Sequence, residues 1–201
     1  KSKSREPTEA TFGFQRASSI SAGDSLSFDV EALDNEYEAT PMGERVAQLY
    51  IDPLSADILL DGLRRAVRRI VRKSLPVTSF SLCHLVAATP DFISLWPKSS
   101  ELEFGSKLRQ KAALVEDELL IESPIDERAM GLVKSAWCTE FWYEERDIRD
   151  IEKELGVTPG DVYSRTDLMG WLLLAAREVL LRDDLFAEEH LGYVAELAGM
   201  L

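Results

Sequence analysis

Beyond Tyr50 the sequence is divided into segments by helix-capping signals, and this punctuation constrains the fold more than any other feature. Several of the signals place a polar cap directly before a proline, which is favoured at the first helical position: they are Asp52-Pro53, Ser123-Pro124 and Thr158-Pro159. Apolar residues recur between the caps at helical spacing, and no segment there alternates as a strand does. The sequence therefore predicts a mainly α-helical fold.

Seven helices are expected after residue 52, and together they form a bundle-like array. The expected ranges are 53–73, 78–89, 99–120, 123–144, a short helix ending at 155, 159–181, and a last helix from 183 or 184 to the end. Thr89-Pro90 ends the second of these, because a residue that precedes proline is pushed out of the helical region. Gly156 ends the fifth as a C-terminal glycine.

The first fifty residues have a different character. Residues 1–23 are rich in Ser, Thr, Glu and Lys without apolar periodicity, and we expect them to be poorly ordered. Residues 25–30 alternate between polar and apolar side chains, and a turn and a short second strand follow. Residues 24–52 are therefore expected to hold a small β-hairpin and a short helix that opens at Thr40-Pro41.

Composition sets limits on the class of protein. The 201 residues are 45% hydrophobic, and no apolar run approaches the roughly 18 residues of a membrane span. The N-terminus lacks the apolar stretch of a signal peptide, so a soluble, cytoplasmic protein without a membrane partner is expected. Cys83 and Cys138 each stand among apolar residues, as small buried hydrophobes do. A disulfide scaffold is not expected.

Charge is the main objection to a nucleic-acid partner. The net charge is −13, whereas a nucleic-acid binder uses Lys and Arg to displace counterions from phosphates. A charge averaged over the chain does not describe the single face that contacts a strand, so the objection weakens if this chain is one part of a larger assembly.

Three stretches carry a more specific pattern. They are TPMGERVAQLYIDPLSA at residues 40–56, HLVAATPD at 84–91, and the segment from Trp142 through GVTPGD at 156–161 to Trp171. In this order and spacing they resemble the archaeal fork-repair DNA helicases of superfamily 2, relatives of human helicase Q and of the helicase half of polymerase theta. The resemblance covers roughly residues 40–201.

This resemblance implies a domain division and a role. Residues 24–52 would be the remnant of a winged-helix domain, and residues 53–201 would be a seven-helix ratchet domain. The helix after Thr158 would cross the channel that carries the 3′ tail of single-stranded DNA. The parent protein would unwind forked DNA in the 3′-to-5′ direction at the expense of ATP, and the motor domains of the same parent chain would be the other partner.

The resemblance also implies contact residues on that helix. In the family an arginine and a tryptophan two turns apart stack against DNA bases; Trp171 holds the tryptophan position, and Ser164 stands at the arginine position. Arg165 is adjacent, but one residue rotates a side chain by about 100° round a helix. Tyr163, Asp167 and Arg177 are further candidates on the same helix.

A core role for Trp171 stays open on spacing alone, since it neighbours an apolar stripe made by Leu168, Leu172, Ala175 and Val179. An aromatic face that stacks on any base is what a strand-guiding helix needs. The two interpretations differ in one observable, because a stacking tryptophan must be exposed in the DNA-free protein.

No motif for catalysis is present. The chain has neither a Gly-x-x-x-x-Gly-Lys-Ser/Thr phosphate loop nor an Asp-Glu-x-His box, so by itself it is not expected to hydrolyse ATP or to bind a cofactor. ATP and Mg²⁺ would belong to the absent motor domains. His84 beside Cys83 lacks further ligands at metal-site spacing, and the acidic pairs at 144–145 and 188–189 are typical of solvated helix faces.

Two further sets of residues are interpreted from their spacing. Trp137, Phe141 and Trp142 are assigned to the core. A basic stripe at i and i+4 spacing either faces phosphates or is a solvated face; it consists of Arg64, Arg65, Arg68, Arg69, Arg72 and Lys73. The alternative to a DNA role is an acidic helical module that binds other proteins.

Overall fold

All regular secondary structure in the described part of the chain is helical. The structure is a computed structural model that describes residues 39–121, 126–183, 186 and 188–201, and within these residues no strand occurs. The helices α2 to α8 confirm the mainly α fold and the seven helices expected after Pro53. The hairpin expected before residue 39 and the lead at 1–23 lie outside the described residues. None of the described helices is long and apolar enough to cross a membrane.

Eight α-helices and three 3₁₀ turns make up these residues. In chain order they are α1 (Pro41–Leu49), α2 (Pro53–Arg72), α3 (Ser79–Ala87), η2 (Ser99–Glu101), α4 (Lys107–Val115), η3 (Glu116–Glu118), α5 (Glu127–Tyr143), α6 (Ile148–Leu155), α7 (Pro159–Leu180), η4 (Glu188–His190) and α8 (Leu191–Met200). Residues Ala39–Leu201 form one compact unit, in which α1 packs against α2 and α7. The domain boundaries at 23/24 and 52/53 stay predictions.

The short helix α3 lies at the centre of this unit. It is apolar nearly all round, and every residue from Phe80 to Ala87 is buried, as expected for a helix enclosed by others. It packs against α2, α5 and α7. At Gly62 a Cβ atom would lie 2.3 Å from Leu85 Cδ1, so the glycine is what allows α2 to approach α3 this closely.

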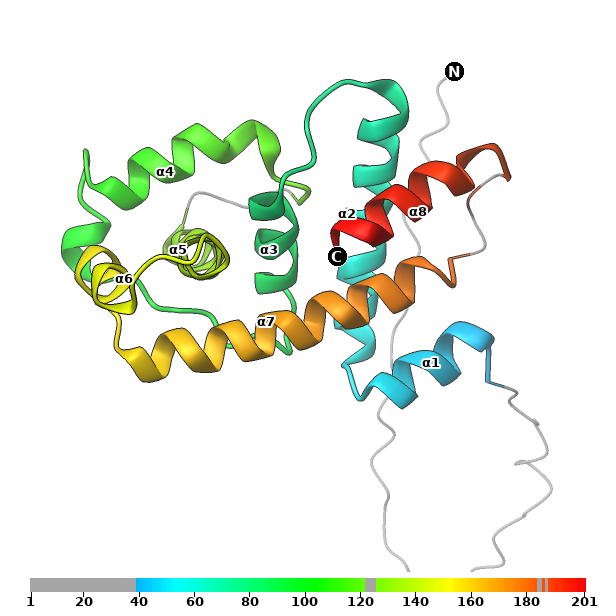
Figure 1. Ribbon diagram of the computed structural model, residues 1–201, viewed down its shortest axis with the longest axis horizontal. Coiled ribbons are helices and arrows are strands. Elements are labelled where there is room, and N and C mark those ends of the chain that lie inside the picture. The colour runs from blue at the N-terminus through cyan, green and yellow to red at the C-terminus, as the bar shows by residue number, and fades with distance from the viewer. Residues whose placement is uncertain (1–38, 122–125, 184–185, 187) are drawn as a thin grey trace, which may run out of the picture. The chain divides into compact units, whose positions relative to one another are not determined.

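Helix α7 runs along the length of the bundle. It begins beside α6, passes α3 and ends near α2 and α8 (Figure 1). It is the longest described helix, with 22 residues, as the sequence led us to expect. Neighbouring helices therefore support α7 along its whole length.

The predicted caps account for most helix boundaries. The Asp52 carboxylate accepts a hydrogen bond of 2.7 Å from the Leu54 amide at the start of α2. Gly156 ends α6 with a φ of 59°, in the left-handed region that glycine tolerates without a steric penalty. These signals act within a few residues, which is why the sequence alone locates them.

Three boundaries differ from the prediction. The helix expected from residue 123 begins at Glu127, because the Asp126 carboxylate caps it by accepting from Ala129 N at 2.8 Å. The single helix expected over 99–120 is divided into η2, α4 and η3, because Gly105 has a φ of 84° and the Ser106 hydroxyl caps a new helix by accepting from Arg109 N at 3.3 Å. The last helix begins at Leu191, later than predicted. The carboxylate of Asp183, expected near its start, instead pairs with Arg64 on α2 at 2.7 Å.

The three aromatic residues assigned to the core all contribute to it, but they are buried to different degrees. Phe141 is buried, whereas Trp137 and Trp142 are only partly buried and pack against the margin of the core. Both cysteines are buried and free, and burial raises the pKa of Cys83 to about 12 and that of Cys138 to about 11. The thiols therefore behave as core hydrophobes.

The charged side chain of Lys134 lies inside the bundle. Lys134, in the middle of α5, has 2% of its surface exposed, and its Nζ lies 2.7 Å and 3.0 Å from the two carboxylate oxygens of Glu101. Glu101 also accepts from the Lys98 amide. The pair fixes the 3₁₀ turn η2 onto the helix α5, which in turn packs against α7.

Candidate functional site

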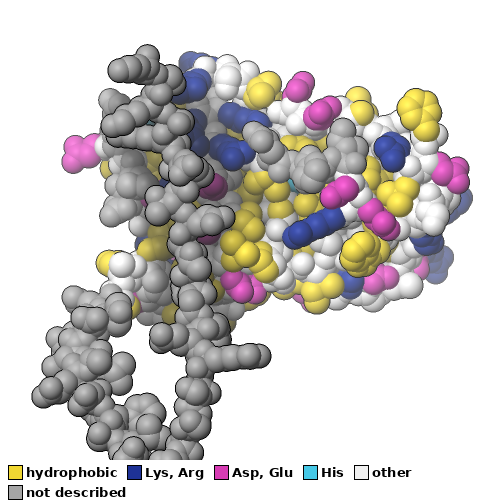
Figure 2. All heavy atoms as spheres, turned by 180° about the vertical axis from the view of Figure 1, so that it is seen from behind, with side chains coloured by type: hydrophobic (Ala, Val, Ile, Leu, Met, Phe, Trp, Pro, Cys, Tyr) yellow, Lys and Arg dark blue, Asp and Glu magenta, His cyan; other side chains and the backbone are white. Residues whose placement is uncertain are grey.

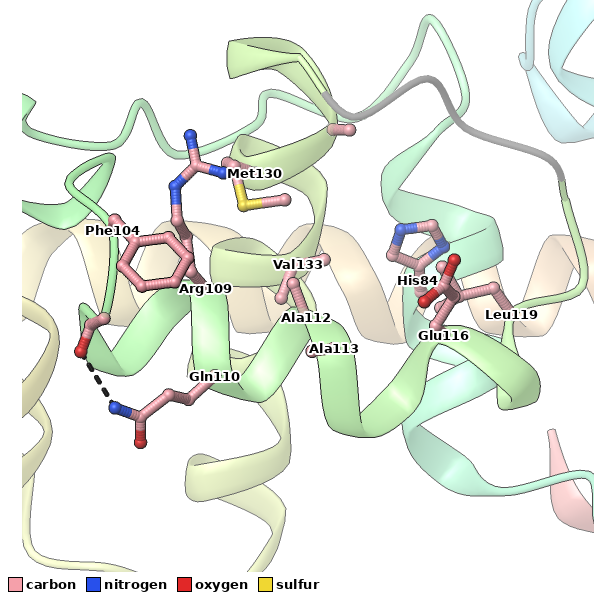
Figure 3. Close-up of a pocket in the computed structure, with 12 residues that line it drawn as sticks. His84, Phe104, Arg109, Gln110, Ala112, Ala113, Glu116, Leu119, Met130 and Val133 are labelled. Atoms are coloured by element: carbon pink, nitrogen blue, oxygen red, sulfur yellow. Dashed lines mark hydrogen bonds between the residues drawn. The ribbon is translucent and has the colours of Figure 1, made fainter.

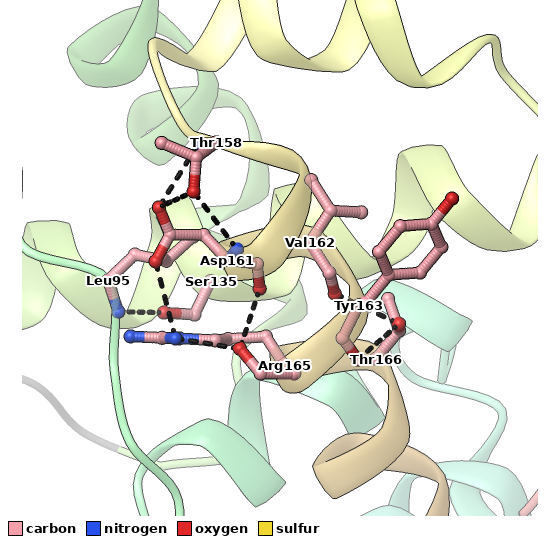
Figure 4. A network of polar contacts seen from close by, with 9 residues as sticks. Leu95, Ser135, Thr158, Asp161, Val162, Tyr163, Arg165 and Thr166 are labelled. Atoms are coloured by element: carbon pink, nitrogen blue, oxygen red, sulfur yellow. Dashed lines mark hydrogen bonds and ion pairs between the residues drawn. The ribbon is translucent and has the colours of Figure 1, made fainter.

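A reciprocal cap fixes the beginning of α7. Thr158 Oγ1 accepts from the Asp161 amide at 3.2 Å, and Asp161 Oδ2 accepts from the Thr158 amide at 3.1 Å, which makes a capping box (Figure 4). The Thr158 hydroxyl also donates to Asp161 Oδ2 at 2.8 Å. This hydrogen bond, the one from the Thr158 amide and the nearby Arg165 charge hold the pKa of the Asp161 carboxyl below its ordinary value. The start of α7, and with it the register of its side chains, is thereby set.

One face of α7 is buried and the opposite face is exposed. The buried face includes Val162, Met169, Leu172 and Val179, which confirms most of the apolar stripe expected there. The exposed residues recur at three- and four-residue spacing along the helix. We call them the open face of α7; they are Tyr163, Ser164, Asp167, Gly170, Trp171, Leu174 and Arg177.

Trp171 belongs to this open face. Trp171 is 39% exposed, so part of its surface is accessible to solvent. A tryptophan enclosed by core side chains is not what the structure contains. Trp171 can therefore meet a flat ligand without any rearrangement of the helix.

Gly170 lies on the open face beside Trp171, and packing does not require a glycine there. A Cβ atom at this position would have one neighbour within 4 Å, the hydroxyl oxygen of Tyr143 at 4.0 Å, which is ordinary van der Waals contact. Glycine inside a helix is less favourable than alanine by about 1 kcal/mol. The absence of a side chain leaves the backbone next to Trp171 bare.

We predict that Gly170→Ala raises the free energy of unfolding by about 0.5–1 kcal/mol, because it removes the helix-propensity cost without a clash. Urea denaturation measures this directly. Gly62→Ala is the matched control and should destabilise the protein, since its Cβ would collide with Leu85. A destabilised Gly170→Ala variant would mean that this glycine has a packing role.

Aromatic side chains from α5 flank the open face. The rings of Trp142 and Tyr163 meet edge to face with their centroids 5.4 Å apart, and Tyr163 stays half-exposed. Tyr143 is also half-exposed, with its hydroxyl near Gly170. The sequence did not identify Tyr143, because its contact is with a different helix and no local spacing reveals it.

Ser164 and Arg165 form a linked pair at the first turn of the open face. Arg165 Nη1 donates to Ser164 Oγ at 2.8 Å and lies 3.3 Å from Asp161 Oδ1 (Figure 4). The Arg165 side chain is only 20% exposed, and its Nε is buried without a hydrogen-bond partner. The guanidinium is thus held next to Ser164, but it is shared with a carboxylate and is not free on the open face.

Asp167 and Arg177 are both exposed on the open face, and neither forms an ion pair with another described residue. Their charges are opposite, so the open face has little net charge of its own. Binding to this face would depend mainly on its aromatic and apolar side chains.

A separate hollow lies between α4 and α5. It has a volume of about 390 Å³, with Phe104 and Arg109 at one end and His84 at the other (Figure 3). Both ring nitrogens of His84 are buried without a hydrogen-bond partner, and burial lowers the pKa of His84 to about 4. No group of three or more potential metal ligands occurs among the described residues. The hollow shares no lining residue with the open face of α7.

Comparison with known proteins gives one family and several relatives. Residues 80–197 match the family model described as archaeal helicase, domain 4. The chain is 28% identical over 157 residues to an ATP-dependent DNA helicase Hel308 of Methanocella arvoryzae, which covers 75% of this chain and 20% of that protein. Proteins of the same name in Pyrococcus horikoshii and Thermococcus kodakarensis are 30% and 31% identical over 149 and 152 residues, or 73% of this chain in each case. Those matches cover 19% and 13% of the relatives, so this chain spans about a fifth of their length or less.

Proposed function

Because the chain belongs to the archaeal helicase domain 4 family, whose model covers more than half of it, we propose that it binds single-stranded DNA as part of a DNA helicase. The observation that carries this proposal is the open face of α7, on which Trp171 is exposed beside the bare backbone of Gly170. Bases of the strand would stack on this face.

Stacking suits a helicase because every base has an aromatic face. A base stacked on an aromatic side chain contributes about 1–3 kcal/mol with little sequence preference. Neighbouring helices support α7 at both of its ends, so the helix that carries Trp171 needs little ordering when a strand arrives. Tyr163 and Tyr143 extend the aromatic surface on the side of α5.

The chemistry of unwinding would lie elsewhere in a parent protein. The relatives are named ATP-dependent DNA helicases, and the 201 residues contain no phosphate-binding loop. Motor domains of the parent would bind ATP and Mg²⁺, while this chain guides the 3′ tail of the strand that is being moved. Residues 24–52 would be the end of a winged-helix domain, and forked DNA under repair would be the substrate.

A second candidate is an acidic module that binds other proteins. The net charge of −13 and several exposed hydrophobic side chains away from α7, among them Ile93, Trp96 and Phe104, favour it. The two candidates differ in their response to salt, because contacts to phosphates release counterions and an apolar protein interface does not.

We predict that the 201-residue chain binds a fluorescent oligodeoxythymidylate with a Kd of roughly 10⁻⁴ to 10⁻⁶ M, the usual range for non-specific binding. Anisotropy titrations at several salt concentrations should give a log–log slope of about −2, the value for about three phosphate contacts at −0.7 each. A random-sequence oligonucleotide of equal length is the control and should bind equally well. Absence of binding, or binding that salt does not weaken, would favour the acidic module.

A further inference from the structure

The second half of α2 carries a group of arginines that surround a shallow hollow. Its volume is about 200 Å³. We call its arginines the α2 cluster; they are Arg65, Arg68, Arg69 and Arg72. From behind the molecule, dark blue Lys and Arg side chains gather on the side where α2 lies (Figure 2).

The hydrogen bonds that the α2 cluster makes within the described residues go to backbone carbonyls. Arg69 donates to the backbone carbonyls of residues 117–119, at 2.7 Å for Leu119, and Arg65 donates to the carbonyl of Leu120. Arg68 and Arg72 are exposed and have no partner among the described residues. None of the ion pairs between described residues includes a member of the cluster.

Several other cations of the described chain do pair with carboxylates. Arg45 pairs with Glu178 at 2.6 Å, and Lys111 pairs with Glu140 at 2.7 Å. A chain with a net charge of −13 has ample carboxylates for such pairs. The four guanidinium groups of the α2 cluster lie together, and none of them has a carboxylate partner among the described residues. They therefore form an unusual concentration of positive charge on this protein.

The helix dipole explains only part of the cluster. Cations in the last turn of a helix are favourable, and Arg69 and Arg72 are in the last turn of α2. That effect falls off within one turn, so it gives no reason for Arg65 and Arg68. Solvated basic faces are common, but their charges are usually interspersed with acidic ones, and the lining of this hollow contains no acidic residue.

Position links the α2 cluster to the end of α7. Arg64, directly before it, makes two hydrogen bonds to Asp183, which follows the end of α7. Arg68 and Arg72 lie one and two turns further along α2. The open face of α7 offers stacking surfaces but a single unpaired cation, Arg177. A nucleic-acid strand on that face would need positive charge beyond it.

We propose that the α2 cluster binds the backbone phosphates of the single strand that contacts α7. Guanidinium groups suit this ligand, because their planar fork can donate two parallel hydrogen bonds to one phosphate. The proposal rests on the proposed function and extends it, since it gives the strand a second contact on a different helix. The cluster supplies charge and the open face of α7 supplies stacking.

The test separates charge from stacking by measuring salt dependence. Arg68→Gln/Arg72→Gln removes the two free cations of the cluster, and Arg149→Gln/Lys153→Gln removes two exposed cations of α6 as a charge-matched control. Trp171→Ala is measured in parallel. Each protein is titrated with the same oligodeoxythymidylate between about 50 and 200 mM salt, and with polyglutamate as an acidic polypeptide.

Loss of two phosphate contacts should reduce the log–log slope by about 1.4, so the ratio of variant to wild-type Kd should fall about sevenfold between 50 and 200 mM salt. The α6 control should keep the wild-type slope. Trp171→Ala should weaken binding at all salt concentrations and leave the slope unchanged.

Equal slopes for the α2 variant and the wild type would overturn the proposal, as would equal losses in the α2 and α6 variants. If Trp171→Ala bound like the wild type while the α2 variant lost slope, stacking on α7 would fail and the phosphate site would stand. Binding of polyglutamate but not DNA through Arg68 and Arg72 would reassign the cluster to an acidic protein. Absence of any oligonucleotide binding would overturn both proposals.

Discussion

Glu101→Ala is expected to lower the free energy of unfolding by about 3–5 kcal/mol, because it removes the carboxylate that compensates a buried charge. Lys134 has 2% of its surface exposed, and Glu101 is its hydrogen-bond partner among the described residues. Without Glu101 the Lys134 ammonium would lie in the interior without a carboxylate that compensates its charge, which is costly. Urea denaturation followed by circular dichroism measures the loss.

Two comparisons make this result specific. Lys107→Ala breaks the ion pair between Lys107 and Glu154, in which the Lys107 side chain is 72% exposed. This change should lower the free energy of unfolding by less than about 1 kcal/mol. Adding Lys134→Met to Glu101→Ala should recover much of the loss, because no buried charge then remains. If Glu101→Ala cost no more than Lys107→Ala, or if the double variant were less stable than Glu101→Ala, the interior pair would not have the role described.

Local signals made most of the fold predictable. A cap such as Asp52 before Pro53, or Thr158 with Asp161, involves residues within one helical turn, so the sequence contains the whole interaction. The same holds for Gly156 at the end of α6. Seven helices after Pro53 followed from these signals, and the described residues confirm them.

The predicted helix boundaries were wrong where two interactions compete for the same residues, because the spacing of residues does not show which interaction forms. The segment 99–120 has enough apolar residues for one helix, yet the left-handed backbone of Gly105 interrupts it and Ser106 starts a new one. Asp183 could have capped the last helix, but its carboxylate pairs with Arg64, far away in the sequence. A tertiary ion pair of this kind cannot be read from local pattern.

The candidate site was predictable in outline but not in its contacts. Trp171 neighbours the apolar stripe of α7, so periodicity alone left a core position open, and only the packing of the bundle decides that the ring is exposed. The proximity of Tyr143 to Gly170 depends on how α5 and α7 are placed. The ion pair of Arg165 with Asp161 is instead an i,i+4 contact within α7, which the sequence spacing could have indicated. Whether Trp171, Ser164 and the other residues of the open face contact DNA stays a prediction.

Trp171→Ala is expected to weaken binding of single-stranded DNA by about 5- to 150-fold, the loss that corresponds to about 1–3 kcal/mol of stacking. Because the ring is 39% exposed, the same change should cost well below the roughly 3–5 kcal/mol of truncating a buried aromatic residue. Trp96→Ala is the matched control: Trp96 is 73% exposed but lies outside α7, in the segment between α3 and η2. It should leave the affinity unchanged.

The most direct test of the central claim, that the open face of α7 stacks on bases, is to compare an oligodeoxythymidylate with an abasic strand of the same length. The two ligands carry the same phosphates, so their difference in Kd for each protein isolates the contribution of the bases. We expect the wild type and Trp96→Ala to prefer the strand with bases by the same factor, and Trp171→Ala to lose most of this preference. An equal preference in all three proteins would contradict it.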